Sequence, residues 1–82
     1  MSAQRGEAGI EAIGKLSQNW DSYGAPPITE AALKVGREVI KMLRESEPFV
    51  TPCSNGGIQL EWHERGIDLE FTFGPDGEQE FE

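Results

Sequence analysis

The first quarter of the chain carries apolar residues at the spacing of one helical face. They recur at steps of three, three and four residues, at Ile10, Ile13, Leu16 and Trp20. Three glycines, at positions 6, 9 and 14, each lower the stability of such a helix by about 1 kcal/mol relative to alanine. We therefore expect a helix that depends on packing against the rest of the fold, with residues 1–8 frayed.

A second apolar stripe begins after residue 29. Thr29 is a typical N-cap, and Glu30 is placed favourably in the first helical turn. Ile28 is placed to pack against Leu33 as a hydrophobic staple, and Pro48 ends the pattern. The sequence predicts a helix from about residue 30 to residue 46, with a stripe formed by Ala32, Val35, Gly36, Val39, Ile40, Met42 and Leu43.

From Gly57 onward the apolar repeat changes to two residues, the period of a strand. One run covers Ile58, Leu60 and Trp62, and the next, after a turn near residues 64–66, covers Ile67, Leu69, Phe71 and Phe73. A Gly-Pro-Asp-Gly turn at 74–77 leads to an expected last strand, 78–82, with Phe81 inward. Residues 48–57 are expected to be a loop. The predicted fold class is α+β, with two N-terminal helices packed on a three-stranded antiparallel β-meander.

The length of 82 residues predicts one domain, 1–82. The sequence has no run of 18 apolar residues and no apolar stretch near its start, so we expect neither a membrane span nor a signal peptide. A single cysteine, Cys53, cannot form an internal disulfide. These features are typical of a bacterial or phage protein of the cytoplasm.

The charge of the chain is distributed unevenly. The formal net charge is −8, yet residues 1–56 hold seven acidic and six basic side chains. Residues 57–82 hold eight acidic side chains against Arg65 alone. Phosphate contact needs Lys and Arg in a patch, so direct binding to nucleic acid or to an anionic membrane is disfavoured. Such a chain is instead attracted to proteins with basic surfaces.

Strand register decides where these acidic residues lie. Because side chains alternate along a strand, turning the apolar set inward forces the intervening residues outward. The outward set is Gln59, Glu61, His63, Asp68, Glu70, Thr72, Glu78, Glu80 and Glu82. Like charges that face each other across strands about 4.8 Å apart destabilise a sheet. The face is either a solubilising surface or a partner-binding surface, and in the second case it binds through Glu61, Asp68, Glu70, Glu78, Glu80 and Glu82.

We expect no enzyme activity, no cofactor and no metal site. Carboxylate pairs such as Glu61 with Glu70 are predicted on an open face, without the water-excluding pocket that acid–base chemistry uses. His63 lacks cysteine partners, which is typical of a solvated edge residue and not of a metal ligand. Cys53 is expected to be an incidental loop residue, with a reactive thiol as the alternative. Gly56-Gly57 precedes a strand, so it does not form a phosphate-binding loop.

Residues 19–28 form a compact connector. Asp21 is placed to accept a hydrogen bond from the backbone two residues on, and Gly24 supplies a permissive backbone angle. Trp20 either packs into the core or forms an exposed binding anchor with Tyr23. The core position is favoured, because so small a core needs its large aromatic side chains, with Asp21 and Tyr23 fixing the turn.

Three segments together carry a resemblance. They are Asn-Trp-Asp-Ser-Tyr-Gly-Ala-Pro-Pro-Ile at 19–28, Gly-Gly-Ile-Gln-Leu-Glu-Trp at 56–62 and Gly-Pro-Asp-Gly at 74–77. The chain resembles, over residues 16–82, a group of small bacterial and phage-encoded proteins of uncharacterised function that share this pattern. The resemblance implies a common fold and carries over no catalytic residues.

The function expected from size and charge is binding inhibition. Small acidic proteins of mobile elements are often anti-CRISPR proteins, DNA mimics or antitoxins, and this comparison is an analogy. The leading hypothesis is an inhibitor that occupies the basic nucleic-acid-binding surface of a partner protein through its acidic sheet face. The alternative is an antitoxin-like module or a self-associating structural module, with no nucleic-acid mimicry. The self-associating module would form a homodimer through the last strand's open edge or the helix faces. A small hydrolase or metal-dependent enzyme is the third hypothesis.

Overall fold

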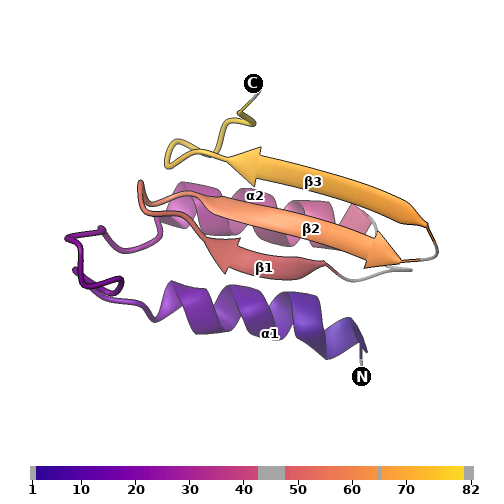
Figure 1. Ribbon diagram of the computed structural model, residues 1–82, viewed down its shortest axis with the longest axis horizontal. Coiled ribbons are helices and arrows are strands. Elements are labelled where there is room, and N and C mark those ends of the chain that lie inside the picture. Colours follow the sequence, from indigo (N-terminus) through magenta and orange to yellow (C-terminus); the bar gives the residue numbers. More distant parts are fainter. Residues whose placement is uncertain (1, 43–47, 65, 81–82) are drawn as a thin grey trace.

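The computed structural model describes residues 2–42, 48–64 and 66–80, which form two helices and a three-stranded sheet (Figure 1). The elements are α1 (Ser2–Gly14), α2 (Glu30–Met42), β1 (Phe49–Pro52), β2 (Ile58–Glu64) and β3 (Ile67–Phe73). α2 lies across β2 and β3, and α1 packs beside it against β1. The α+β class, with two helices followed by an antiparallel sheet, is confirmed, whereas only two of the three predicted strands, those that correspond to β2 and β3, belong to the observed sheet.

The sheet is a meander in the order β1-β2-β3, and both strand pairs are antiparallel. Ile58 pairs with Phe73, and His63 pairs with Asp68. This register buries Ile58, Leu60 and Trp62 against the helices. The inward set predicted for β2 is therefore confirmed, and the residues that alternate with it face away from the helices.

The prediction of a loop at 48–57 is wrong in its first half, because β1 lies there. Phe49, Val50 and Thr51 are β-formers, and Val50 pairs with Leu60 on the inward face. α1 comes close to Val50 because Gly9 carries no side chain: a Cβ there would lie 3.0 Å from the Val50 Cβ. Pro52 is tolerated because β1 is an edge strand.

The prediction of a last strand at 78–82 is also wrong for residues 78–80, the part of it that the structure describes. After β3 the chain folds back through the hydrogen bonds from Gly77 N to Gly74 O and from Gly74 N to Glu78 O. Only an isolated bridge between Phe73 and Gln79 follows. Residues 78–80 hold no apolar side chain that burial would favour as a strand; Phe81 and Glu82 lie outside the described residues.

The predicted N-cap is confirmed. Thr29 Oγ1 accepts a hydrogen bond from Ala32 N at 3.1 Å and donates one to Pro75 O at 2.6 Å. Thr29 N also donates to Gly56 O at 3.0 Å, so one residue ties the start of α2 to two turns of the sheet. Residues 43–46, the predicted end of this helix, lie outside the described residues, and fraying of residues 1–8 stays a prediction.

The core lies between the helices and the sheet. Its buried side chains are Ile10, Ile13, Ile28, Ala32, Leu33, Ile40, Ile58, Leu60, Trp62 and Phe73. Gly36 lets α2 approach closely, since a Cβ there would lie 2.5 Å from Ile58 Cδ1 and 2.9 Å from Ile10 Cδ1. Neither described helix is long and apolar enough to span a membrane.

Candidate functional site

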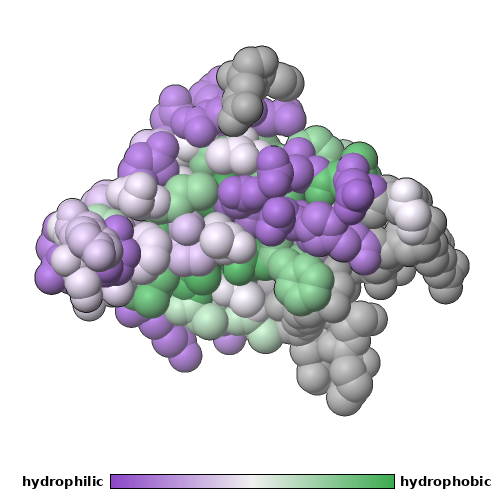
Figure 2. Space-filling model, viewed as in Figure 1, coloured by the Kyte–Doolittle hydropathy of each residue, from purple (hydrophilic) through white to green (hydrophobic). Residues whose placement is uncertain are grey.

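The open face of the sheet, turned away from the helices, carries the candidate site. Its strand positions are Phe49 and Thr51 in β1, Gln59, Glu61 and His63 in β2, and Asp68, Glu70 and Thr72 in β3. Figure 2 views this face, where hydrophilic side chains gather over β2 and β3 beside a more hydrophobic area toward β1. We call it the acidic sheet face; none of these eight positions is Lys or Arg.

Two carboxylates face each other at the centre of the acidic sheet face. Glu61 and Glu70 are direct cross-strand partners. Gln59 Nε2 donates a hydrogen bond to Glu70 Oε2 at 2.6 Å, which orients this carboxylate without neutralising it. Like charges at directly opposed positions cost a sheet stability, so this pair is held in place by the rest of the fold.

His63 compensates part of this charge when its imidazole is protonated. Its Nδ1 lies 2.6 Å from Asp68 Oδ1, and its Nε2 lies 3.7 Å from Glu61 Oε2. The hydrogen bond with Asp68, together with the negative charges of Asp68 and Glu61, raises the pKa of His63 above its ordinary value. Among the described residues, the ion pairs of this face all involve His63. The net charge of the face therefore depends on pH close to neutrality.

Two further carboxylates reach the same face from the segment after β3. A Cβ at Gly74, which continues the outward alternation of Glu70 and Thr72, would lie 2.7 Å from Glu80 Oε2 and 3.3 Å from Asp76 Oδ1. Asp76 is fixed there by the hydrogen bond that its Oδ1 accepts from Glu78 N at 3.0 Å. The glycine leaves room into which both carboxylates fold.

Cys53 lies near this end of the face. Partial burial, and secondarily the negative charge of Glu80, raise the pKa of its thiol. A raised pKa lowers the thiolate fraction, so this cysteine lacks the environment of a reactive thiol. No group of three or more described His, Cys, Asp or Glu side chains is arranged to hold a metal ion.

The structure brings together four of the six predicted partner-binding residues: Glu61, Asp68, Glu70 and Glu80. Glu78 is exposed directly after the turn at 74–77, and Glu82 lies outside the described residues. Two further residues of this surface are not predicted from the sequence: Asp76, whose place depends on the fold of the turn, and Phe49, which is 50% exposed beside Glu61. The sequence signal for β1 is the run of three consecutive β-formers, Phe49-Val50-Thr51.

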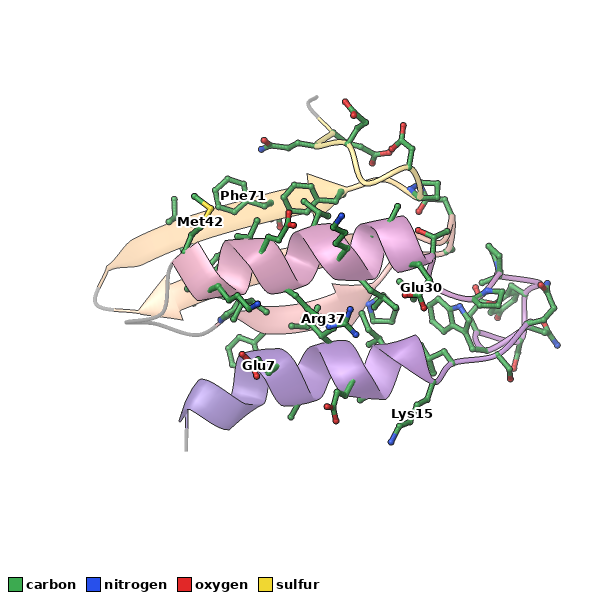
Figure 3. All side chains as sticks on the ribbon, turned by 180° about the vertical axis from the view of Figure 1, so that it is seen from behind. Glu7, Lys15, Glu30, Arg37, Met42 and Phe71 are labelled. Atoms are coloured by element: carbon green, nitrogen blue, oxygen red, sulfur yellow. The ribbon has the colours of Figure 1, made fainter. Side chains whose placement is uncertain are left out.

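A second surface feature lies between the helices. Glu7, Glu11, Arg37 and Lys41 line a shallow hollow of about 120 Å³. Figure 3 shows Glu7 and Arg37 on the facing sides of α1 and α2. Two acidic and two basic side chains give this hollow no net charge, so it does not select a ligand of one sign.

The connector between the helices is held by many hydrogen bonds. Asp21 Oδ1 accepts from Tyr23 N at 2.8 Å and from Ala25 N at 3.0 Å, and these bonds lower the pKa of Asp21. Trp20 packs half-buried against the core, with its Nε1 donating to Pro26 O at 2.8 Å. The predicted core position of Trp20 is thus confirmed, whereas the Tyr23 side chain is 92% exposed and does not fix the turn.

Comparison of the chain with protein-family models, with curated proteins and with solved structures found no match. The resemblance of residues 16–82 to small bacterial and phage proteins therefore stays a prediction.

Proposed function

We propose that this protein is a binding inhibitor that occupies a basic, nucleic-acid-binding surface of a partner protein through its acidic sheet face. One observation carries the proposal: Glu61 and Glu70 are opposed across two strands, and no Lys or Arg occupies an outward strand position of this face. The arrangement costs stability, and a role in binding gives a reason for it. The action proposed needs no catalytic residue and no cofactor.

The spacing of the carboxylates suits a surface that normally binds phosphates. Neighbouring strands lie about 4.8 Å apart, and outward residues follow each other at about 6.8 Å along a strand. Both spacings are below the Debye length of about 8 Å at physiological ionic strength, so the charges act on a partner together. Duplex DNA likewise presents closely spaced charges of one sign, which basic side chains neutralise.

The border of the face offers a contact of another kind. Phe49 pairs with Glu61 and is half-exposed, so an aromatic ring lies next to the central carboxylates. Charge complementarity mainly speeds association and sets its specificity, whereas aromatic burial contributes affinity. We expect the partner to be a nucleic-acid-binding protein of the cytoplasm, such as a defence complex or a toxin.

The test compares two triple variants of equal net charge. One changes Glu61, Glu70 and Glu80 to lysine, and the other changes Glu7, Glu11 and Glu38, on the helices, to lysine. Proteins captured from source cells by the wild type are purified, and their binding to both variants is measured at increasing salt. Circular dichroism shows whether each variant is folded.

The expected result is loss of binding for the sheet variant alone. The wild type should also displace a labelled nucleic acid from the captured partner, with weaker displacement at higher salt. Equal binding of both variants, or a partner that keeps its nucleic acid in the presence of excess wild type, contradicts the proposal.

A further inference from the structure

β3 has one paired edge and one largely open edge. β2 pairs with β3 along its whole length, from Ile67 to Phe73. On the other edge, the described chain returns to β3 through Glu80 N, which donates to Thr72 O at 2.8 Å. Within the described residues, the open part of this edge therefore runs through Asp68 and Glu70.

The backbone bonds show which groups point to the open edge. Because Thr72 O bonds to Glu80, the N–H and C=O of Thr72 point away from β2. In an antiparallel strand every second residue has the same orientation, so the N–H and C=O of Asp68 and Glu70 also point outward. Leu69 and Phe71 exchange their hydrogen bonds with β2. The open edge thus offers two donors and two acceptors to an added strand.

The two sides of this edge differ in chemistry. Asp68 and Glu70 place exposed carboxylates on the acidic sheet face. On the helix side, Leu69 is 45% exposed, Phe71 is half-buried, and Met42 of α2 is 79% exposed. Figure 3, seen from the helix side, shows Met42 and Phe71 in the same part of the molecule, where α2 ends. One side of the edge is therefore acidic and the other apolar.

A second copy of this chain does not fit the edge. Antiparallel pairing of β3 with another β3 over this stretch brings the outward carboxylates of both copies to opposed or diagonal positions, about 4.5–8 Å apart. Like charges at those positions oppose association. The same positions favour a strand that carries cations.

We propose that the open edge of β3 binds an extended segment of the partner in which basic residues alternate with apolar ones. Pairing with the backbone of Asp68 and Glu70 places every second side chain beside their carboxylates and the others beside Leu69, Phe71 and Met42. The inference deepens the proposed function and rests on it for the basic character of the segment. The added strand extends the sheet to four strands, next to the acidic sheet face.

The first test uses synthetic peptides as probes. A fluorescent peptide, Thr-Lys-Val-Arg-Val-Lys-Ile-Thr, is titrated with the whole protein, and its anisotropy is followed. One control groups the same basic residues together in a scrambled order. The second control is a pair of peptides that carry N-methyl groups on alternate backbone nitrogens, one peptide for each of the two alternate sets, or frames. In one frame the methyl groups replace the N–H groups that face β3, and in the other they replace those that face away.

We expect the alternating peptide to bind at least about tenfold more tightly than the scrambled one. N-methylation should weaken binding in one frame and not in the other, because only one set of N–H groups pairs with β3. Equal affinity of all these peptides means that charge alone holds them. That result overturns the edge inference and leaves the acidic sheet face as proposed.

The second test changes the edge itself. Glu70→Ala and Glu70→Pro remove the same charge, but only proline also removes the outward N–H, which makes no bond to β2. Glu70→Pro should bind the alternating peptide about tenfold more weakly than Glu70→Ala, and equal affinities of the folded variants contradict the inference. If the proline variant does not fold, the N-methylated peptides decide the same question.

A third outcome separates the two proposals. If the triple variant at Glu61, Glu70 and Glu80 binds the alternating peptide as tightly as the wild type, the carboxylates do not select the segment. That result contradicts the inference that the bound segment is basic. The open edge of β3 then no longer supports the proposed function. If no peptide binds, the edge inference is wrong, and the displacement of nucleic acid from the captured partner still tests the proposed function.

Discussion

Glu61 in β2 and Glu70 in β3 are direct cross-strand partners, and both side chains lie on the open face of the sheet. Surfaces that serve only solubility mix both signs of charge, because opposed like charges are unfavourable. The pair therefore gives the acidic sheet face a measurable effect on stability as well as a proposed role in binding.

Removing one charge of this pair should stabilise the protein. We expect Glu61→Gln to raise the free energy of unfolding by about 0.2–1 kcal/mol at low salt, and by less at high salt. The measurement is urea unfolding at a pH well above the ordinary histidine pKa of about 6.5, where the contact of Glu61 with His63 contributes least.

Glu78→Gln is the matched control, because it removes the same charge from an exposed position that follows the Gly74–Gly77 turn and lies outside the three strands. It should change the unfolding free energy less than Glu61→Gln does. Destabilisation by Glu61→Gln, or a gain in stability that does not depend on salt, contradicts repulsion between Glu61 and Glu70.

His63 should make stability depend on pH. Its pKa is raised in the folded state by Asp68 and Glu61. A raised folded pKa means that the contribution is fully present below the unfolded pKa of about 6.5 and is lost as the pH rises through the folded value. The stability difference between wild type and His63→Gln should therefore be larger at pH 5.5 than at pH 8.5, as urea unfolding at both pH values will show.

The same titration should act on binding in the opposite direction. Protonated His63 neutralises part of the acidic sheet face, so a basic partner should bind more weakly as the pH falls through the folded pKa. Nuclear magnetic resonance of the His63 imidazole signals gives that pKa directly. A histidine that titrates at or below its ordinary value contradicts both expectations.

The helices and the β2–β3 hairpin could be predicted because their apolar repeats are long enough to distinguish the two periods. α1 nevertheless ends at Gly14, before Leu16 and Trp20 of its predicted stripe. β1 was missed because its four residues, which follow Pro48 and end with Pro52, are too few for a period and too rich in proline for a strand of the sheet interior. The segment 78–82 was predicted as a strand because Glu78, Glu80 and Glu82 alternate with Phe81. In the structure, the turn at Gly74–Gly77 leads into only a single bridge.

The part of the candidate site that lies on β2 and β3 could be predicted, because the apolar repeat of these strands could be read from the sequence. Glu61, Asp68 and Glu70 follow from strand alternation alone. Glu80 was predicted on this face as part of a last strand, but it reaches the face, with Asp76, over Gly74, a contact that depends on how the turn folds. His63 was expected to be solvated, and it is exposed; its contact with Asp68 follows from the register between the strands.

Two glycines in the helices should respond in opposite ways to the same substitution. Gly36→Ala places a Cβ 2.5 Å from Ile58 Cδ1 and 2.9 Å from Ile10 Cδ1, within the buried core. Overpacking of this kind costs about 1–3 kcal/mol, which outweighs the helix propensity of alanine, about 1 kcal/mol. We expect net destabilisation in thermal and urea unfolding.

Gly14→Ala is the matched control at the end of α1. The added Cβ meets Leu33 Cδ1 at 3.4 Å, an ordinary contact, so the gain in helix propensity should remain. This variant should be as stable as the wild type or more stable, by up to about 1 kcal/mol. If both variants shift stability in the same direction, the close approach of α2 to Ile58 does not decide the effect.

The connector should depend on Asp21 and not on the ring of Tyr23. Asp21 Oδ1 holds two backbone N–H groups, those of Tyr23 and Ala25, and its pKa is lowered by these bonds. A lowered folded pKa means that this stabilisation is present above the unfolded pKa of about 3.9 and is lost as the pH falls through the folded value. Asp21→Ala should therefore destabilise the protein at neutral pH, and the difference from the wild type should shrink in acid.

Tyr23→Ala tests the same connector from the other side. Its side chain is 92% exposed, while the hydrogen bond to Asp21 comes from its backbone, so the substitution should change stability by no more than about 0.5 kcal/mol. Urea unfolding of the two variants at neutral and acidic pH gives the comparison. A larger loss of stability for Tyr23→Ala than for Asp21→Ala would mean that the Tyr23 ring holds the turn. The hydrogen bonds to the Asp21 carboxylate would then not be what orders this segment.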